Sequence, residues 1–524
     1  MKILVNGNFH TLDPRNPTPE FLAIDHGCIV AAGSIQEADT LRGERINLNG
    51  ATVLPGLTDS HIHLHLYSQF VTSVQCETDT LQQTLDLVKD RANHSKPGQW
   101  ILGTGWNQNV WPEGFGTAKM LDEVAPENPV YLTSKSIHSA WVNSSALQLA
   151  GITRSTKDPE NGVIQRDDHG EATGILFEEA MGIVEDIVPP PSVQELSNSL
   201  ETVITMLHRM GLTGAHNFDR ILCFQALQAL DIEHKLNFRV LQSIPHEALE
   251  YAVKSGLRSG FGSNFLKIGP VKIFMDGALG PHTAAMIDPY EGKSAEWGIL
   301  FLDDEQVFEI GQLAAKSGLS MAAHAIGDNA NHMVLGGLQM LREYESLHQL
   351  PNLPHRIEHV QLLHPSDLNR LSELNIIASM QPIHATSDMI IADDHWGDRA
   401  QFSYAWNTLL QRNTKLIFGS DAPVETANPF HGIHAAVTRQ RTDGYPGGEG
   451  WYPAERLSLN EALAGYTYHA AEATRWNGQI GRLGIGYFAD LIVLERNPFA
   501  IPPSDLHTIT PSRVMVDGEW VVNG

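Results

Sequence analysis

Three histidines in five residues, His61, His63 and His65, directly follow an apolar run in the stretch "ATVLPGLTDSHIHLH". Side chains two residues apart lie on the same face of a strand, so His61 and His63 would point to one side while Ile62 points to the other. Two neutral imidazoles that converge in this way can bind a metal ion. An HxH pair alone is weak evidence, because an exposed polar strand edge would give the same pattern.

Four further polar residues interrupt or end apolar runs later in the chain. Lys272 lies inside "GPVKIFMDG", where burial is costly unless the lysine is modified or paired, for example with Asp421 or Asp276. His324, His359 and Asp421 end the runs "LSMAAHA", "HRIEH" and "LIFGSD". Any one histidine could be a satisfied core residue. If the runs are parallel strands of a barrel, however, all these side chains meet at the rim formed by the C-terminal strand ends.

The elements that would position these residues alternate between strand and helix from residue 57 to residue 474. The helical pattern "DEQVFEIGQLAAKSG", for example, precedes the apolar run "LSMAAHA". Such alternation implies parallel strands joined by right-handed crossovers. With the stretch at 57–63 we count eight strands, which predicts an α/β fold built on a (β/α)₈ TIM barrel.

Two other regions do not follow the barrel pattern. Residues 1–56 and 475–524 contain short strand patterns separated by Asn-Gly and Asp-Gly turns. Neither end has enough strand to bury a sheet alone, so we expect them to form one small composite β-sandwich. Residues 68–200, between the first and second barrel strands, contain extra strand patterns, and we expect an inserted α+β subdomain there.

Composition limits the classes of partner. The 524 residues are 42% hydrophobic and 18% charged, which is ordinary for a globular protein with a large core. No apolar run reaches the length of a membrane span, and the first ten residues do not resemble a secretory leader. The net charge of −26 argues against nucleic acid and anionic membranes as partners. We expect a cytoplasmic protein that acts on a small molecule, and a homo-oligomer is compatible with the sequence.

Five motifs occur in a fixed order along the chain: "PGLTDSHIHLH", "KIFMDGALG", "HAIGDNA", "RIEHVQ" and "GSDAPVE". Together they resemble the amidohydrolase superfamily, and in particular the branch that includes N-substituted formamide deformylases and the exoenzyme regulatory protein. The resemblance covers nearly the whole chain, including the β-sandwich. It implies an HxH pair on the first barrel strand, a lysine on the fourth, single histidines on the fifth and sixth, and an aspartate on the eighth.

The resemblance also implies a ligand set and a modification. An ammonium group has no lone pair for a metal, so Lys272 would be carboxylated, and its two new oxygens would bridge two metal ions. Nitrogen and oxygen ligands suit Zn²⁺, and one ion or another divalent metal fits the same residues. The expected ligands of one or both ions are His61, His63, Lys272, His324, His359 and Asp421. One metal would be held by His61, His63 and Asp421, and the other would be held by His324 and His359.

The ligand set predicts hydrolysis by metal-activated hydroxide. A bound metal lowers the pKa of water and polarises the scissile carbonyl. Asp421 would then accept the proton of the water and pass it to the leaving amine, as general base and then general acid. Asp421 as a ligand only is the simpler alternative.

Eight further residues are candidates for binding the substrate. Four of them, Trp106, Trp111, His138 and Trp141, lie in the insertion, where they could line an apolar pocket or form the insertion's own core. The other candidates are His216, Gln381 and His384 near the rim, and His282. His282 stands in "GALGPHT" where relatives often have arginine, and this departure weakens any inference of an acidic substrate group.

The sequence therefore predicts a metal-dependent amidohydrolase that acts on a non-peptide C–N bond of a small amide, with N-substituted formamides as the nearest named class. Hydrolysis of a cyclic amide or an ester is the alternative within enzymes. A regulatory binding protein that has lost turnover is the alternative outside them. A complete ligand set argues against the last, because a binder need not keep all six groups.

Overall fold

The computed structural model describes residues 1–136 and 138–523. The chain forms two compact units, Met1–Tyr67 with Leu196–Gly524, and Ser68–Glu195. The second unit covers most of residues 68–200, where the sequence predicts an inserted subdomain. Among the described helices, none combines the length and the hydropathy that a membrane crossing requires.

The first unit contains an eight-stranded sheet in which every neighbouring pair is parallel. Its strands are β7 (Leu57–Ile62), β14 (Leu212–Asn217), β15 (Arg239–Pro245), β16 (Leu266–Phe274), β17 (Met321–Ala325), β18 (Arg356–His359), β19 (Ile377–Met380) and β20 (Leu416–Phe418). A parallel bridge between Ile62 and Ala422 brings the segment after β20 beside β7, which nearly closes the barrel. The predicted (β/α)₈ barrel is confirmed.

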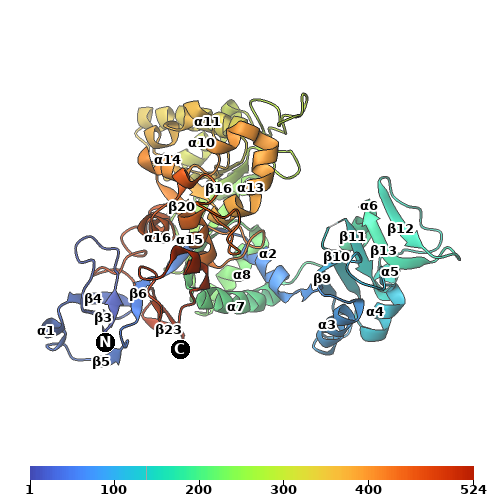
Figure 1. The fold of residues 1–524 in the computed structure, drawn as a ribbon, viewed down its shortest axis with the longest axis horizontal. Coiled ribbons are helices and arrows are strands. Elements are labelled where there is room, and N and C mark those ends of the chain that lie inside the picture. The colour runs from blue at the N-terminus through green and yellow to red at the C-terminus, as the bar shows by residue number, and fades with distance from the viewer. Residues whose placement is uncertain (137, 524) are drawn as a thin grey trace. The chain divides into compact units, whose positions relative to one another are not determined.

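Burial explains why these runs form strands. In β16, the sequence "LKIGPVKIF" is buried at every residue except the last, as expected of a parallel strand covered on both faces. Helices occupy the connections between the strands (Figure 1). They are α2 (Leu64–Thr72), α7 (Val193–Arg209), α8 (Ile221–Ile232), α9 (Leu249–Lys254), α10 (Asp304–Lys316), α11 (Asp328–Leu347), α12 (Arg370–Glu373), α13 (Pro382–Trp396), α14 (Trp406–Gln411), α15 (Pro429–Thr438), α16 (Leu459–Gly465) and α17 (Tyr468–Glu472).

The two ends of the chain contribute to two small sheets. One has the order β4-β3-β1-β5 and the other β2-β6-β21-β22-β23. Their elements are β1 (Lys2–Val5), β2 (Asn8–Phe9), β3 (Phe21–Asp25), β4 (Cys28–Gly33), α1 (Ile35–Ala38), β5 (Glu44–Asn47), β6 (Thr52–Pro55), β21 (Leu491–Leu494), β22 (Arg513–Val516) and β23 (Glu519–Val522). β6 pairs antiparallel with β21, and Leu22 of one sheet shares a core with Met515 of the other. Strands from the two ends of the chain therefore lie in one sheet and share one core.

A buried ion pair fastens the barrel to the C-terminal sheet. Arg239, at the start of β15, is 2% exposed and donates from Nε and Nη2 to the carboxylate of Asp490, just before β21. Its Nη2 also donates to Asp517, between β22 and β23, at 3.1 Å. Because both the arginine and Asp490 are buried, losing either would leave an uncompensated charge in the interior.

We expect deletion of residues 485–524 to yield insoluble protein. The deletion removes β21 to β23, exposes the edge of β6, and leaves Arg239 buried without its carboxylates. The measurement is the soluble fraction after expression and the circular dichroism of any soluble product. Removing only residues 523 and 524, beyond β23, is the control and should leave solubility unchanged. A soluble, cooperatively folded 1–484 fragment would show that the two ends are independent.

The inserted unit has a six-stranded sheet with the order β12-β13-β11-β10-β9-β8. Its elements are β8 (Val74–Gln75), α3 (Leu81–Asn93), β9 (Ile101–Trp106), α4 (Ala118–Val124), β10 (Val130–Ser134), β11 (Ser139–Val142), α5 (Ser144–Leu149), β12 (Gly162–Arg166), β13 (Ala172–Glu178) and α6 (Glu179–Glu185). Its core contains three tryptophans together with leucine, isoleucine and valine side chains.

Candidate metal centre

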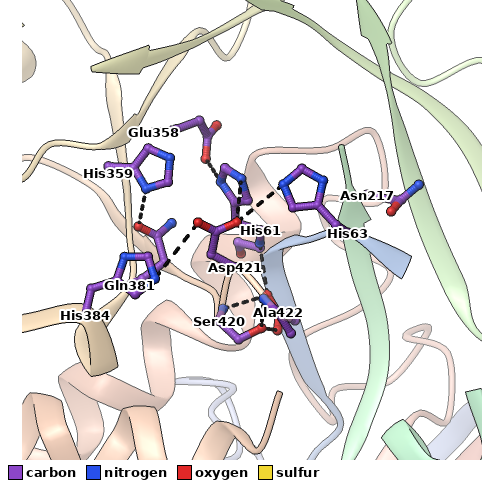
Figure 2. Close-up of polar contacts among 12 residues, drawn as sticks. His61, His63, Asn217, Glu358, His359, Gln381, His384, Ser420, Asp421 and Ala422 are labelled. Atoms are coloured by element: carbon purple, nitrogen blue, oxygen red, sulfur yellow. Dashed lines mark hydrogen bonds and ion pairs between the residues drawn. The ribbon is translucent and has the colours of Figure 1, made fainter. Parts of the chain in front are cut away.

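The predicted ligands all lie at or just beyond the C-terminal ends of barrel strands. His61 is near the end of β7, His359 is the last residue of β18, and Asp421 follows β20 by three residues. One ligand atom from each of these three lies within 4.8 Å of the others, which is close enough for a single metal ion. Figure 2 shows His61, His63 and His359 arranged around the Asp421 carboxylate. These residues therefore lie at the C-terminal rim of the barrel, and their role as metal ligands stays a prediction.

The other predicted ligands adjoin this group. His63 Nε2 lies 3.4 Å from Asp421 Oδ1, and His61 Nε2 lies 3.6 Å from the same oxygen. The His324 ring is centred 4.5 Å from that of His359, which is in turn 5.0 Å from that of His61. The structure therefore brings all four histidines and the aspartate into one cluster.

Hydrogen bonds fix the tautomers of three of the imidazoles. His61 Nδ1 lies 2.8 Å from Glu358 Oε2 and donates to it, so Nε2 keeps its lone pair. His359 Nδ1 donates to Gln381 Oε1 at 2.9 Å, and His324 Nε2 donates to a backbone carbonyl at 2.9 Å. Each ring thus presents its second nitrogen as a possible metal ligand, an arrangement typical of histidines that bind metals.

Burial keeps most of these histidines neutral. Burial, reinforced by the positive charge of an unmodified Lys272, lowers the pKa of His61 to about 4 and that of His324 to about 3. Burial also lowers the pKa of His359 well below its usual value. For His63 burial acts in the same direction, but hydrogen bonds with Asp219 and Asp421 outweigh it and raise its pKa to about 9. Three imidazoles are therefore in the neutral form that a metal requires.

Lys272 is buried in the barrel, and the part of the chain that the structure describes gives it no polar partner. It is 5% exposed, and its Nζ lies 4.5 Å from the centre of the Phe218 ring and 5.0 Å from that of Phe274. No hydrogen bond or ion pair joins Nζ to a side chain of residues 1–136 or 138–523, so the pairings with Asp421 or Asp276 considered above are not formed. Burial lowers the pKa of Lys272 to about 8.

The side chain of Asp421 is ionised among these neighbours. Burial alone would raise its pKa, but the neighbouring His61 and His63 hold the pKa well below the usual value. Both His359 and Asp421 have a left-handed backbone, with φ of 74° and 58°. Such conformations are uncommon for residues other than glycine and are found at functional sites, where the surroundings enforce them.

The strand that carries His61 and the segment that carries Asp421 are tied together by Asp59, which the sequence reasoning missed. Its carboxylate accepts the backbone N–H of His61 at 3.0 Å and both the N–H and the O–H of Ser420, at 3.0 and 2.5 Å. Gly419 allows this approach, because a Cβ there would lie 2.4 Å from the His61 nitrogen. Asp59 thus holds two candidate ligands in register across the barrel closure.

Two other buried carboxylates adjoin the cluster: from the sequence, Asp276 was considered only as a partner of Lys272, and Glu358 was not singled out. Asp276 is 1% exposed and accepts backbone N–H groups of Ala285, Ile326 and Gly327, with Oδ1 lying 3.5 Å from His324 Nε2. Glu358 is 0% exposed and bonds to both His61 and Arg356. The signal for both was a charge inside an apolar run, in "KIFMDG" and "HRIEHV".

The remaining rim candidates have different positions. Gln381 and His384 lie at the cluster: Gln381 accepts from His359, and His384 Nε2 is 3.9 Å from Asp421 Oδ2.

His216 is buried, and its Nδ1 accepts from Arg356 Nη1 at 2.7 Å. His282 instead bonds to Glu296 and His395, and no described contact links it to the ligand cluster.

The candidates in the insertion occupy its interior or its surface. Trp106, Trp111 and Trp141 are at most 4% exposed, lie in one core cluster, and donate their indole N–H groups to backbone carbonyls. His138 is exposed and bonds to Glu178 at 3.0 Å. The tryptophans thus form the insertion's own core, which was the alternative considered. Substrate binding by these four residues stays a prediction.

We expect Glu358→Gln to weaken metal binding and to destabilise the fold. The amide can no longer neutralise Arg356 while it accepts from His61, so Zn²⁺ affinity should fall about 10- to 100-fold and the free energy of unfolding by about 3 kcal/mol. Metal titration and urea unfolding measure the two effects. An unchanged Zn²⁺ affinity would show that Glu358 does not orient His61.

A second buried triad supplies the matched control for this variant. Glu345 accepts from His355 Nε2 at 2.9 Å and from Arg342 Nη1 at 2.7 Å, and it is 3% exposed. It has the same residue types as the Glu358 triad but lies in α11, away from the ligand cluster. Glu345→Gln should therefore lower stability without changing the metal affinity.

Comparison with known proteins gives consistent matches. Residues 44–522 match the model of the amidohydrolase family. Protein LONG AFTER FAR-RED 3 of Arabidopsis thaliana is 33% identical over 515 residues, covering 94% of this chain and 87% of that protein. N-substituted formamide deformylase of Arthrobacter pascens is 26% identical over 542 residues, covering 98% and 97%. A metal-dependent hydrolase of Pyrococcus furiosus superimposes with a TM-score of 0.79 at 28% identity, covering 95% and 99%.

Proposed function

Because the chain belongs to the amidohydrolase family, we propose that it hydrolyses the C–N bond of a small amide, with N-substituted formamides as the first substrates to test. The observation that carries this proposal is the ligand cluster. His61 and His359 each donate one ring nitrogen to an acceptor and leave the other free close to the Asp421 carboxylate, and the ring of His324 adjoins that of His359. The deformylase among the relatives supports the substrate class.

The residues present fit a divalent metal, and Zn²⁺ suits their nitrogen and oxygen donors. His61, His63 and Asp421 would hold one ion, and His324 and His359 a second, with carboxylated Lys272 shared between them. The cluster of His61, His359 and Asp421 includes members of both sets, as expected if the two sets adjoin. When bound, the metal supplies Lewis-acid activation of water and of the scissile carbonyl.

Asp421 is the residue we propose as general base and acid. Because its pKa is held low, it is ionised at neutral pH and can accept the proton of the attacking water on a carboxylate oxygen. The same proton can then pass to the nitrogen of the leaving amine. His384 Nε2 is buried, lies 3.9 Å from Asp421 Oδ2, and has no hydrogen-bond partner among the described residues, so it can donate to a group bound there.

Lys272 is proposed to carry the bridging carboxylate. Its neutral Nζ would attack the carbon of CO₂ and release one proton, which forms an N–C bond and leaves a carboxylate with two oxygens. A pKa of about 8 makes the neutral amine available near neutral pH. The modification would replace an unpaired buried cation by an anion that metal ions neutralise, and this removes the main cost of burying the lysine.

The proposal is tested with purified protein, with and without chelation, on N-alkylformamides, other amides, cyclic amides and esters. We expect formate and amine in equal amounts, loss of activity on chelation, and recovery with Zn²⁺. Turnover of cyclic amides or esters alone would replace the proposed substrate class. A metal-loaded protein that turns over none of these compounds would favour a binding protein.

A further inference from the structure

A cleft of about 610 Å³ in the first unit opens onto the proposed metal centre. Its lining includes His63 and Lys272, so a molecule in the cleft is adjacent to the ligand cluster. The volume lies in the range of small-molecule binding sites. The cleft borders one side of the centre only, because Gln381, His384 and His359 on the other side are buried and do not line it.

The wall of this cleft has unusually exposed apolar side chains. The exposed fraction is 46% for Leu66, 65% for Ile221, 51% for Phe274 and 50% for Phe301. Single exposed apolar residues are common on protein surfaces, but a group of them around one concave site indicates a binding surface. Phe218 also lines the cleft, and its ring lies against Lys272 Nζ. This ring extends the apolar wall to the proposed metal centre.

These side chains converge from separate elements. Leu66 lies on α2, Ile221 is the first residue of α8, Phe274 ends β16, and Phe301 lies in the segment before α10. The N–H of Phe301 donates to the carbonyl of Met275 at 2.7 Å, which anchors that segment against the end of β16. The apolar wall is therefore assembled by the tertiary fold and is not one face of a single helix.

The charged groups of the cleft are largely committed to one another. Arg220 Nε lies 3.6 Å from Glu247 Oε1 at the exposed rim. The carboxylate of Asp219 accepts the N–H of His65 at 2.5 Å and lies 3.5 Å from His63 Nδ1. Apart from Lys272, which the proposed function assigns to the metal centre, these charged groups already have partners, whereas an apolar substituent would meet an open apolar wall.

We propose that this cleft binds an apolar substituent of the substrate, next to Lys272 and His63. The inference rests on the proposed function and adds a preference to it: amides with longer alkyl or aryl groups are better substrates than short ones. Each methylene that leaves water should raise kcat/KM about fourfold until the wall is covered. This preference arises from the cleft residues and not from the ligand cluster.

The test is a chain-length series measured with the metal-loaded protein. N-methyl-, N-propyl- and N-pentylformamide vary the amine side, and N-methyl amides of acetic, butyric and hexanoic acid vary the acyl side. A rise of about fourfold per methylene in either series supports the cleft and identifies which side of the bond it holds. Hydrolysis with a flat kcat/KM in both series would overturn the inference while leaving the proposed function intact.

If no amide is hydrolysed, the proposed function fails and the cleft is tested by binding. Calorimetry with N-pentyl- and N-methylformamide should then still show tighter binding of the longer chain, and equal affinities would overturn the inference.

Helix α8 offers a matched pair of variants. Ile221 at its start lines the cleft, and Ile232 at its end is 78% exposed and does not. Ile221→Ala should lower the pentyl-to-methyl ratio of kcat/KM about tenfold, whereas Ile232→Ala should leave both the ratio and the basal activity unchanged. Equal ratios in the two variants would contradict the assignment of the wall. Both side chains are exposed, so neither change should disturb folding.

Discussion

Lys272→Ala is expected to lower activity by at least roughly 10³-fold and to reduce the metal content of the purified protein. The physical reason is that Lys272 is buried over two aromatic rings with no polar partner among the described residues, where a free ammonium would repel the metal ions proposed beside it. Carboxylation replaces that repulsion by ligation. A short carboxylic acid that fills the gap in the variant should restore part of the activity.

Reassembly supplies a second readout of the same prediction. Apoprotein should regain activity with Zn²⁺ faster when bicarbonate is present, because the carbamate must form from the neutral amine and CO₂. Electron density at the lysine tip is the direct observable, since the modification is lost in acid. A bare amine in a metal-loaded, active crystal would contradict the bridging role.

The same strand provides the control. Lys267 in β16 is also largely buried, but its Nζ donates to the carbonyl of Arg475 at 3.1 Å and lies over the Trp476 ring. It lies five residues nearer the N-terminal end of the strand, away from the ligands. Lys267→Ala should therefore lower stability and leave metal content and bicarbonate dependence unchanged.

The barrel could be predicted from the sequence because its strands are buried on both faces. The buried run "GPVKIF" is apolar except for Lys272, and the largely apolar runs "LSMAAH" and "LIFGSD" end at candidate ligands, so the apolar pattern marks both the strands and the candidate site. The role of the three tryptophans in the insertion could not be settled in this way. Aromatic residues line pockets and fill cores alike, and only the packing of Trp106 against Trp111 and Trp141 places them in a core.

The candidate ligands could be predicted for a related reason, whereas the residues that orient them could not. His61 and His359 lie at or near the end of a strand and Asp421 follows one, which is a local signal. Asp59 and Glu358 act through partners far away in the sequence: Ser420 lies 361 residues from Asp59, and His61 lies 297 residues from Glu358. A buried carboxylate shows its role only when the fold brings its donors to it.

Asp421→Asn is expected to reduce kcat by about 10²- to 10⁴-fold, because an amide of the same shape cannot accept the proton of water or return it to the amine. The amide oxygen can still approach a metal, so most of the metal should be retained, and kcat is to be compared at equal metal content. The wild-type carboxylate is ionised at neutral pH because His61 and His63 hold its pKa low.

A nearby aspartate separates this role from a general loss of charge. Asp388 in α13 accepts the O–H of Tyr404 at 2.6 Å and makes no described contact with the predicted ligands. Asp388→Asn removes one negative charge from α13 and should keep kcat within about threefold, since a partly exposed charge outside the ligand cluster is screened by solvent and salt. If Asp421→Asn kept its metal and stayed within tenfold of wild type, Asp421 would be a ligand only, and the proton would have to pass through another group. His384, which is not among the predicted ligands and whose Nε2 lies 3.9 Å from Asp421 Oδ2, is the candidate for that group.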